Sequence, residues 1–196
     1  MKNITKLVLI FAITLASCNP NVRISEDEEG SGSVITEKRA ITESFDKIIA
    51  TAGLNVTITQ GASNLVEVET DDNLIKYVVA KVENGILMLK IDGNVSFMST
   101  INIRVTAKSF TALKASGGAT INAKNTLTGN KIDIQTSNGS QITAALEFDK
   151  VNCLASTGST IIISGKAKQL YIGSSSGSEI DTNKLEAEET VDIPLE

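Results

Sequence analysis

The stretch from Ser116 to Ile180 carries one six-residue pattern four times: SGGATI at 116–121, SNGSQI at 137–142, STGSTI at 156–161 and SSGSEI at 175–180. The consensus is Ser-x-Gly-(Ser/Ala)-x-Ile. Its isoleucines are 21, 19 and 19 residues apart, and a fixed period of about 20 residues is typical of proteins whose repeats stack on one another. This stretch therefore decides the fold that the sequence predicts.

Short runs of alternating apolar and polar residues lie on both sides of each Ser-x-Gly. Ile132 and Ile134 precede the second copy, and Ile142 and Ala144 follow its glycine. Alternation with period two predicts strands with one buried face. Two or three short strands per repeat, without a helical run, predict an all-β fold. We expect a right-handed parallel β-helix with 19–21 residues per coil and an isoleucine ladder inside it.

The glycine of each repeat is expected at a tight corner between two strands. Such a corner requires a positive φ, which glycine adopts without steric cost. We therefore expect the same left-handed backbone at Gly139, Gly158 and Gly177.

The first 18 residues have the character of a lipoprotein signal peptide. Lys2 and Lys6 precede an apolar run from 7 to 15 that is too short to span a bilayer comfortably. The following LASC at 15–18 resembles the lipobox of bacterial lipoproteins, and that resemblance implies cleavage before Cys18 and lipidation of Cys18. The protein is then attached to the membrane through this N-terminal lipid anchor. The alternative is an ordinary secretory signal with a chance cysteine.

Residues 19–40 show no apolar period and predict a tether. The run SEDEEGSGS at 25–33 is acidic and then rich in glycine and serine, a composition that cannot bury enough apolar surface to fold. The acidic run resembles the export tags of surface lipoproteins in the Bacteroidetes, and a solvated spacer is the alternative. We expect the folded domain to cover residues 41–196.

The beginning of this domain is less regular than the repeats. Thr51-x-Gly53-x-x-Val56 keeps the spacing of the pattern as a degenerate fifth copy, and we expect it to form the first coil. After it, Asn84-Gly85 between two apolar runs predicts a β-hairpin. We expect residues 60–110 to form irregular strands and hairpins that flank or cap the coils, because stacked repeats need atypical ends.

The end of the chain leaves two alternatives open. Val191 is expected in the register of Leu170 and would begin a further coil, but Pro194 follows it closely. Either the chain is truncated there or Pro194 stops the stack. In both cases the last strand would expose an open edge.

Several phrases together resemble the head GIN domain family over roughly residues 41–193. They are GLNVTI at 53–58, ETDDNLI at 69–75, ENGIL at 83–87 and the four repeats. This family comprises autotransporter-adhesin-like lipoproteins, frequent in the Bacteroidetes and also described as a domain of unknown function. The resemblance implies a right-handed parallel β-helix and brings no catalytic residues with it.

The composition argues against several kinds of chemistry. The 196 residues include no histidine, carry a net charge of −5 and are only 4% aromatic. Without histidine there are no His-based triads and no imidazole metal ligands, and the negative charge argues against nucleic acid as a partner. We expect no catalytic, metal or cofactor-binding residues, no cofactor and no enzymatic activity.

Cys153 could be a reactive thiol, but its position in the repeat favours a structural role. If Cys18 carries lipid, Cys153 has no partner for a disulfide. It also shares the register of Ile134 and Ile172, so we expect a small buried hydrophobe and not a reactive thiol.

These observations favour a lipid-anchored cell-envelope protein that presents a Ser/Thr/Asn-rich face for adhesion or surface interaction. We expect a bacterial outer-membrane lipoprotein on the periplasmic or surface-exposed side. Its partner would be an unidentified envelope or surface protein or glycan, and the open C-terminal edge would also allow homo-oligomers.

The alternative function is a polysaccharide-active or sugar-binding β-helix protein. Asp133 and Asp192 are expected at equivalent outward positions, but Asn152 and Tyr171 separate them across the stack. Sugar-binding platforms also rely on aromatic faces, and Tyr171 is the only aromatic residue expected to project outward from the repeats. Both observations weigh against this alternative.

Overall fold

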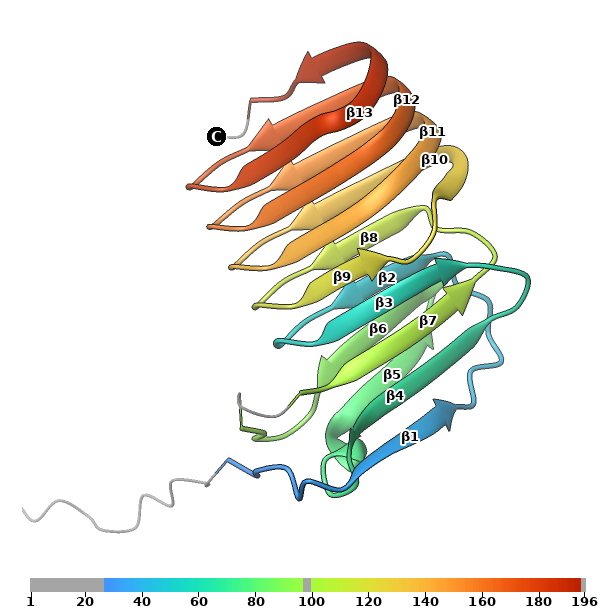
Figure 1. Cartoon of the computed structure of the whole chain (residues 1–196), viewed down its shortest axis with the longest axis vertical. Helices are drawn as coiled ribbons and strands as arrows, with labels where there is room; N and C mark the ends of the chain where they lie inside the picture. The colour runs from blue at the N-terminus through green and yellow to red at the C-terminus, as the bar shows by residue number, and fades with distance from the viewer. Residues whose placement is uncertain (1–26, 97–99, 195–196) are drawn as a thin grey trace, which may run out of the picture.

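The computed structural model describes residues 27–96 and 100–194, and Figure 1 shows them as a stack of strands in two facing layers. Within these residues thirteen strands form one sheet, together with a single 3₁₀ turn. The elements are β1 (Val34–Arg39), β2 (Lys47–Ala50), β3 (Asn55–Gln60), β4 (Leu65–Asp71), η1 (Ile75–Tyr77), β5 (Val78–Glu83), β6 (Ile86–Ile91), β7 (Asn102–Ala107), β8 (Ala112–Ala115), β9 (Thr120–Ala123), β10 (Leu127–Thr136), β11 (Gln141–Ala155), β12 (Thr160–Ser174) and β13 (Glu179–Asp192).

The expected right-handed parallel β-helix is wrong, because the sheet is a nearly closed barrel with mixed pairing. Its strand order is β1-β4-β7-β3-β9-β11-β10-β8-β2-β6-β5, with β12 and β13 added beyond β11. The pairs β1–β4, β4–β7 and β5–β6 are antiparallel, whereas the other neighbours are parallel. Antiparallel strands reverse the direction of the chain, so the first half does not wind as one coil.

The two edge strands of the first half meet at one end of the molecule. The Nη2 group of Arg39, at the end of β1, donates hydrogen bonds to the carbonyl oxygens of Ile75 and Val78 at 2.8 and 3.1 Å. Val78 is the first residue of β5. This bridge brings the β1 and β5 edges together and nearly closes the sheet.

The isoleucine ladder expected from the repeats is confirmed by the register of the parallel strands. Ile142 pairs with Ile121 and with Ile161, and Ile161 pairs with Ile180. Ile121, Ile142 and Ile161 are fully buried, while Ile180 is only partly buried because it lies on the last strand. The ladder forms the centre of an aliphatic core that continues into the first half of the chain.

The register of β13 differs from the expected one by a residue. Leu170 pairs with Thr190, not with Val191, because an extra residue in β13 shifts the pairing between Ile162 and Ser164. Thr190 and Asp192 therefore occupy the positions that Leu170 and Ile172 hold on β12. At this end of the stack, polar residues replace aliphatic ones on one half of the strand.

The corners of the repeats have the predicted backbone. The φ angles of Gly139, Gly158 and Gly177 are +69°, +64° and +70°, which confirms the left-handed conformation. The serine after each glycine also has a structural role: the Ser140 hydroxyl accepts a hydrogen bond from the Ser137 amide at 3.1 Å and donates to a backbone carbonyl at 2.8 Å. The same contacts recur at Ser159 and Ser178, so the repeated serines close the turns.

The ordered structure also includes part of the stretch expected as a tether. Strand β1 lies within residues 19–40 and pairs with β4. Glu28 forms an isolated bridge with Val95, and its side chain accepts a hydrogen bond from the Tyr77 hydroxyl. The described chain thus begins docked against the barrel, at the end opposite to β13 (Figure 1).

Candidate interaction surface

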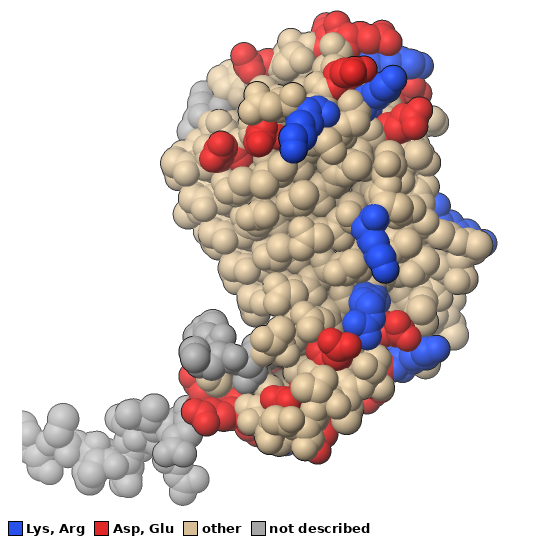
Figure 2. Space-filling model, viewed as in Figure 1, with Lys and Arg blue, Asp and Glu red and all other residues tan. Residues whose placement is uncertain are grey.

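Strands β3, β9, β11 and β12 lie in the front layer of Figure 1, and their outward side chains form a band of neutral polar groups. These residues point outward from β3, β9, β11 and β12, alternate with buried core residues, and lie in two rows because the four strands pair in register. We call this band the polar face; its residues are Asn55, Thr57, Thr120, Asn122, Gln141, Thr143 and Thr160. Figure 2 shows a broad uncharged area in the middle of this face, with charged groups at the two ends of the molecule and basic groups along one side.

The side chains of the polar face are available to a partner. Asn55 and Asn122 are exposed, and the others are half-buried. The described chain shows one hydrogen bond between two of these side chains, from the Gln141 amide to the Thr143 hydroxyl at 3.3 Å. Across residues 27–96 and 100–194, the side chains of Asn55, Thr57 and Asn122 have no hydrogen-bond partner. Amides and hydroxyls both donate and accept hydrogen bonds, so the band suits polar recognition.

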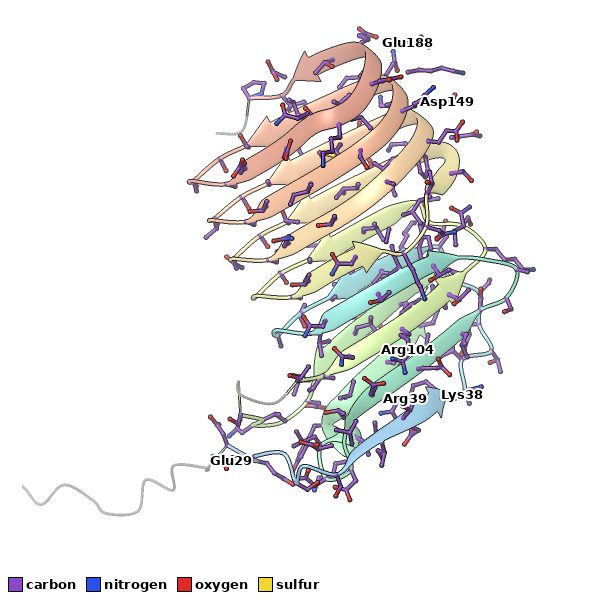
Figure 3. The ribbon with its side chains drawn as sticks, in the orientation of Figure 1. Glu29, Lys38, Arg39, Arg104, Asp149 and Glu188 are labelled. Atoms are coloured by element: carbon purple, nitrogen blue, oxygen red, sulfur yellow. The ribbon has the colours of Figure 1, made fainter. Side chains whose placement is uncertain are left out.

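Below the polar face the same two rows continue into a network of charges. On β7, Arg104 donates hydrogen bonds to Glu69 from both terminal nitrogens at 3.0 Å, and its Nε lies 3.6 Å from a Glu67 carboxylate oxygen. Figure 3 shows Arg104 beside β4. Hydrogen bonds from Arg104 and Asn102 hold the pKa of the Glu69 carboxyl below its usual value. These charges are compensated locally, so this end of the rows is less open to a partner than the neutral band.

The back layer does not bring catalytic carboxylates together. Asp133 accepts a hydrogen bond from Asn152 at 2.6 Å and pairs with Lys131 at 3.0 Å. The expected equivalence of Asp133 and Asp192 is wrong, because the extra residue in β13 places Asp192 opposite Ile172. The two carboxylates lie in different rows and do not form a pair suited to glycoside hydrolysis.

Tyr171 points outward from β12, but a lysine side chain already lies over its ring. The Lys150 ammonium lies 4.2 Å from the ring centroid, within the range of a cation–π contact. A sugar could stack on this ring only by displacing the lysine, which weakens the sugar-binding alternative further.

The structure tests the prediction for one of the two cysteines. Cys153 is fully buried, and burial raises the pKa of its thiol to about 12 because the thiolate is poorly solvated there. Its expected role as a small core hydrophobe is confirmed. Cys18, the expected lipidation site, lies outside the described residues.

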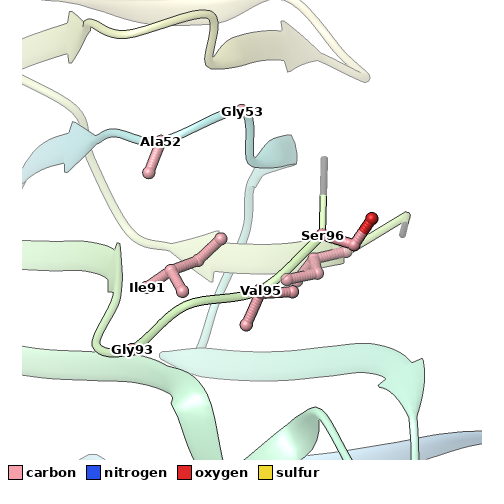
Figure 4. Close-up of a pocket in the computed structure, with 7 residues that line it drawn as sticks. Ala52, Gly53, Ile91, Gly93, Val95 and Ser96 are labelled. Atoms are coloured by element: carbon pink, nitrogen blue, oxygen red, sulfur yellow. The ribbon is translucent and has the colours of Figure 1, made fainter. Parts of the chain in front are cut away.

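The cavity between the corner at Gly53 and the segment after β6 is small. Its volume is about 150 Å³, and it is lined by Ala52, Gly53, Ile91, Gly93, Val95, Ser96 and Ile101 (Figure 4). Pockets for drug-sized ligands have volumes of about 300–1,000 Å³. Its lining is mostly apolar and contains no carboxylate, so the cavity does not resemble a catalytic site.

The described part of the chain has neither a metal-binding group nor a membrane-spanning helix. It contains no group of three or more acidic, cysteine or histidine residues that could hold a metal ion. None of its helices has the length and apolar character needed to cross a membrane.

The fold and the polar face define an all-β domain that presents a flat, neutral, hydrogen-bonding surface. The chain belongs to the family described as "Putative auto-transporter adhesin, head GIN domain", which matches residues 44–193. The resemblance found in the sequence is therefore confirmed. No curated protein matches the chain.

Solved structures of similar fold include proteins from Bacteroides and Parabacteroides. A putative adhesin from Bacteroides fragilis NCTC 9343 has a TM-score of 0.77 and 20% identity, over 85% of this chain and 80% of that one. A putative adhesin from Parabacteroides distasonis ATCC 8503 has a TM-score of 0.69 and 20% identity, over 86% and 81%. A putative lipid binding protein from the same strain has a TM-score of 0.64 and 16% identity, over 86% and 81%. At these identities the likeness concerns the fold alone.

The sequence pattern did not identify the polar face as a unit. The alternation in Asn55-Val56-Thr57 marks Asn55 and Thr57 as outward residues. Their position beside Asn122 depends on the pairing of β3 with β9, two strands separated by more than 50 residues of sequence. The signal in the sequence for this pairing is Thr51-x-Gly53-x-x-Val56, whose spacing marks it as a degenerate copy of the repeat.

Proposed function

We propose that this domain is an attachment module of the bacterial cell envelope that binds its partner across the polar face without catalysis. The polar face carries this proposal, because its seven neutral side chains form a flat array of donors and acceptors. Recognition on such a surface sums many weak polar contacts and needs no deep pocket. Membership in an adhesin-head family supports the same function.

The partner that we propose is a protein or glycan of an envelope or cell surface. Neutral amides and hydroxyls match the hydroxyl and amide groups of such partners, and the central band lacks the lysine and arginine clusters that recognise phosphate groups. The domain would hold its partner through hydrogen bonds that can form and break individually, so the affinity of a single copy is expected to be modest.

We also propose that Cys18 anchors the protein to the outer membrane through lipid. Cys18 precedes the first described residue, Asp27, by nine positions, and nine extended residues can span about 30 Å. Figure 1 places the start of the described chain beside β1, at the end opposite to β13. An anchor at Cys18 would therefore leave the β13 end farthest from the membrane and the polar face accessible from the side.

The test uses cells that display the full chain and measures their attachment to surfaces coated with mucin or with matrix protein. The double variant Thr57→Glu/Asn122→Glu places two charges in paired positions of the polar face, and attachment should fall at least tenfold. Lys114→Glu changes an exposed charge on β8 in the back layer and serves as the matched control. Attachment that survives the double variant, with an unchanged melting temperature, would contradict the proposal.

A further inference from the structure

Strand β13 is an edge that leaves part of the core uncovered. Within the described residues it pairs with β12 alone. Ile180, Leu185 and Ala187 pack against the core but remain partly exposed, whereas Ile161 and Ala167, their ladder neighbours on β12, are buried. A further strand would cover these side chains and pair the free edge of the backbone.

The charges on the stacked strands alternate from one layer to the next. On β12, Lys168 lies 2.6 Å from Asp149 of β11, and Glu188 of β13 also favours its charged form, raising its pKa. Lys166 lies 3.8 Å from Glu186 of β13. Figure 3 shows Asp149 and Glu188 on the same rim of the stack. A basic layer thus lies between two layers that carry acidic residues.

Strand β13 ends this alternation with an excess of acidic residues. It has one lysine and six acids, namely Glu179, Asp181, Glu186, Glu188, Glu189 and Asp192. A strand added beyond it at the usual spacing of about 4.8 Å would lie directly over these carboxylates. Lysine or arginine at those positions would be attracted, while acidic residues would be repelled.

The same charges argue against a second copy of this chain as the occupant. Two β13 edges would bring acidic residues face to face. The opposite end of the molecule also carries acidic side chains, including Glu29, Asp71 and Asp72, and Figure 2 shows acidic groups at both ends. An acidic edge of this kind disfavours unspecific strand pairing and selects partners by charge.

We propose that the outer edge of β13 is a docking site for an extended, basic segment of another envelope protein. The segment adds as a parallel strand, with aliphatic side chains over Leu185 and Ala187 and lysine or arginine over Glu186 and Glu188. This inference rests on the proposed function as a binding module, but it assigns a second surface at the membrane-distal end and states the chemistry of its partner.

The probe for this site is a labelled peptide with the sequence of residues 160–174, TIIISGKAKQLYIGS, because β13 already pairs with this strand. Binding to the full chain is followed by fluorescence anisotropy. A control peptide carries glutamate in place of the two lysines. The lysine peptide should bind at least ten times more tightly than the control, and added salt should reduce the difference.

The matching protein variant is Glu186→Lys/Glu188→Lys, which reverses the charge of two exposed side chains on β13. It should reverse the preference, so that the glutamate peptide binds better, and an unchanged fold is checked by thermal melting. The proposal would be overturned if the two peptides bound the unmodified chain equally well, or if the charge-reversed variant kept the preference for the lysine peptide. A dimer of the unmodified chain that dissociates in this variant would identify a second copy as the occupant and would overturn it as well.

The polar-face variant keeps the two proposals separate. Thr57→Glu/Asn122→Glu lies on the front layer and should leave peptide binding unchanged. If peptide binding fails while attachment depends on the polar face, the docking site is wrong and the proposed function stands. If attachment is insensitive to the polar face while peptide binding follows the charges of β13, the proposed attachment surface is wrong.

Discussion

Truncation of one ladder residue tests the register and the open edge together. Ile161 is fully buried between Ile142 and Ile180, whereas Ile180 is only partly buried at the end of the ladder. Replacing Ile161 by alanine removes three buried carbons at about 0.8 kcal/mol each, and the cavity left between two fixed strands adds to this loss. We expect Ile161→Ala to lower the free energy of unfolding by about 3–4 kcal/mol.

Ile180→Ala is the matched control, because the residue type, the ladder and the change are the same. Without a strand above it, Ile180 loses less burial and leaves no enclosed cavity, so we expect about 1–2 kcal/mol. The two free energies follow from urea unfolding of the variants, with the slopes compared to verify that the transitions remain alike. Equal losses would contradict this prediction, because they would mean that Ile180 is covered as completely as Ile161.

Three other predictions concern the corner, the buried thiol and the anchor. Ser159→Ala should cost about 1–3 kcal/mol in chemical unfolding, because the buried Thr136 hydroxyl loses its hydrogen bond to Ser159 and the Ser156 amide keeps only its bond to the Thr136 carbonyl; no measurable loss would show that the corner hydroxyl is dispensable. Cys153 should resist a thiol reagent at pH 8 until the protein unfolds, because the pKa of its thiol is about 12, and rapid labelling of the folded protein would contradict its burial. Cys18→Ala should release the full chain from membranes and abolish labelling by a fatty-acid probe, whereas unchanged labelling would exclude Cys18 as the lipid site.

The repeats predicted the second half of the chain well. Strands β10 to β13 pair in parallel with the isoleucines in line, because side-chain alternation and a constant period are local properties that each coil repeats. The positive φ at Gly139 and the burial of Cys153 followed from the same local pattern. Each of these features depends on residues that are close in sequence or one period apart.

The prediction of a right-handed parallel β-helix failed in the first half. Residues 41–115 contain strands with good alternation, but their direction and their neighbours are decided by contacts between distant segments. Strand β2 lies between β6 and β8, and β3 lies between β7 and β9. Strand β4 is antiparallel to both of its partners. The apolar period of a strand is the same in either direction, so it cannot distinguish these pairings.

For the candidate surfaces, too, some features follow from local sequence and others from the pairing of distant strands. Alternation in the sequence shows which side chains point outward, as in Asn55-Val56-Thr57. The degenerate repeat at Thr51-x-Gly53-x-x-Val56 indicated a coil in line with Ile121, as the pairing of β3 with β9 shows. The shifted register that places Asp192 opposite Ile172 is visible in the folded chain and not in the sequence. The physical reason is that alternation sets the direction of a side chain through the local backbone, whereas its neighbours across the sheet depend on hydrogen bonds between strands far apart in the chain.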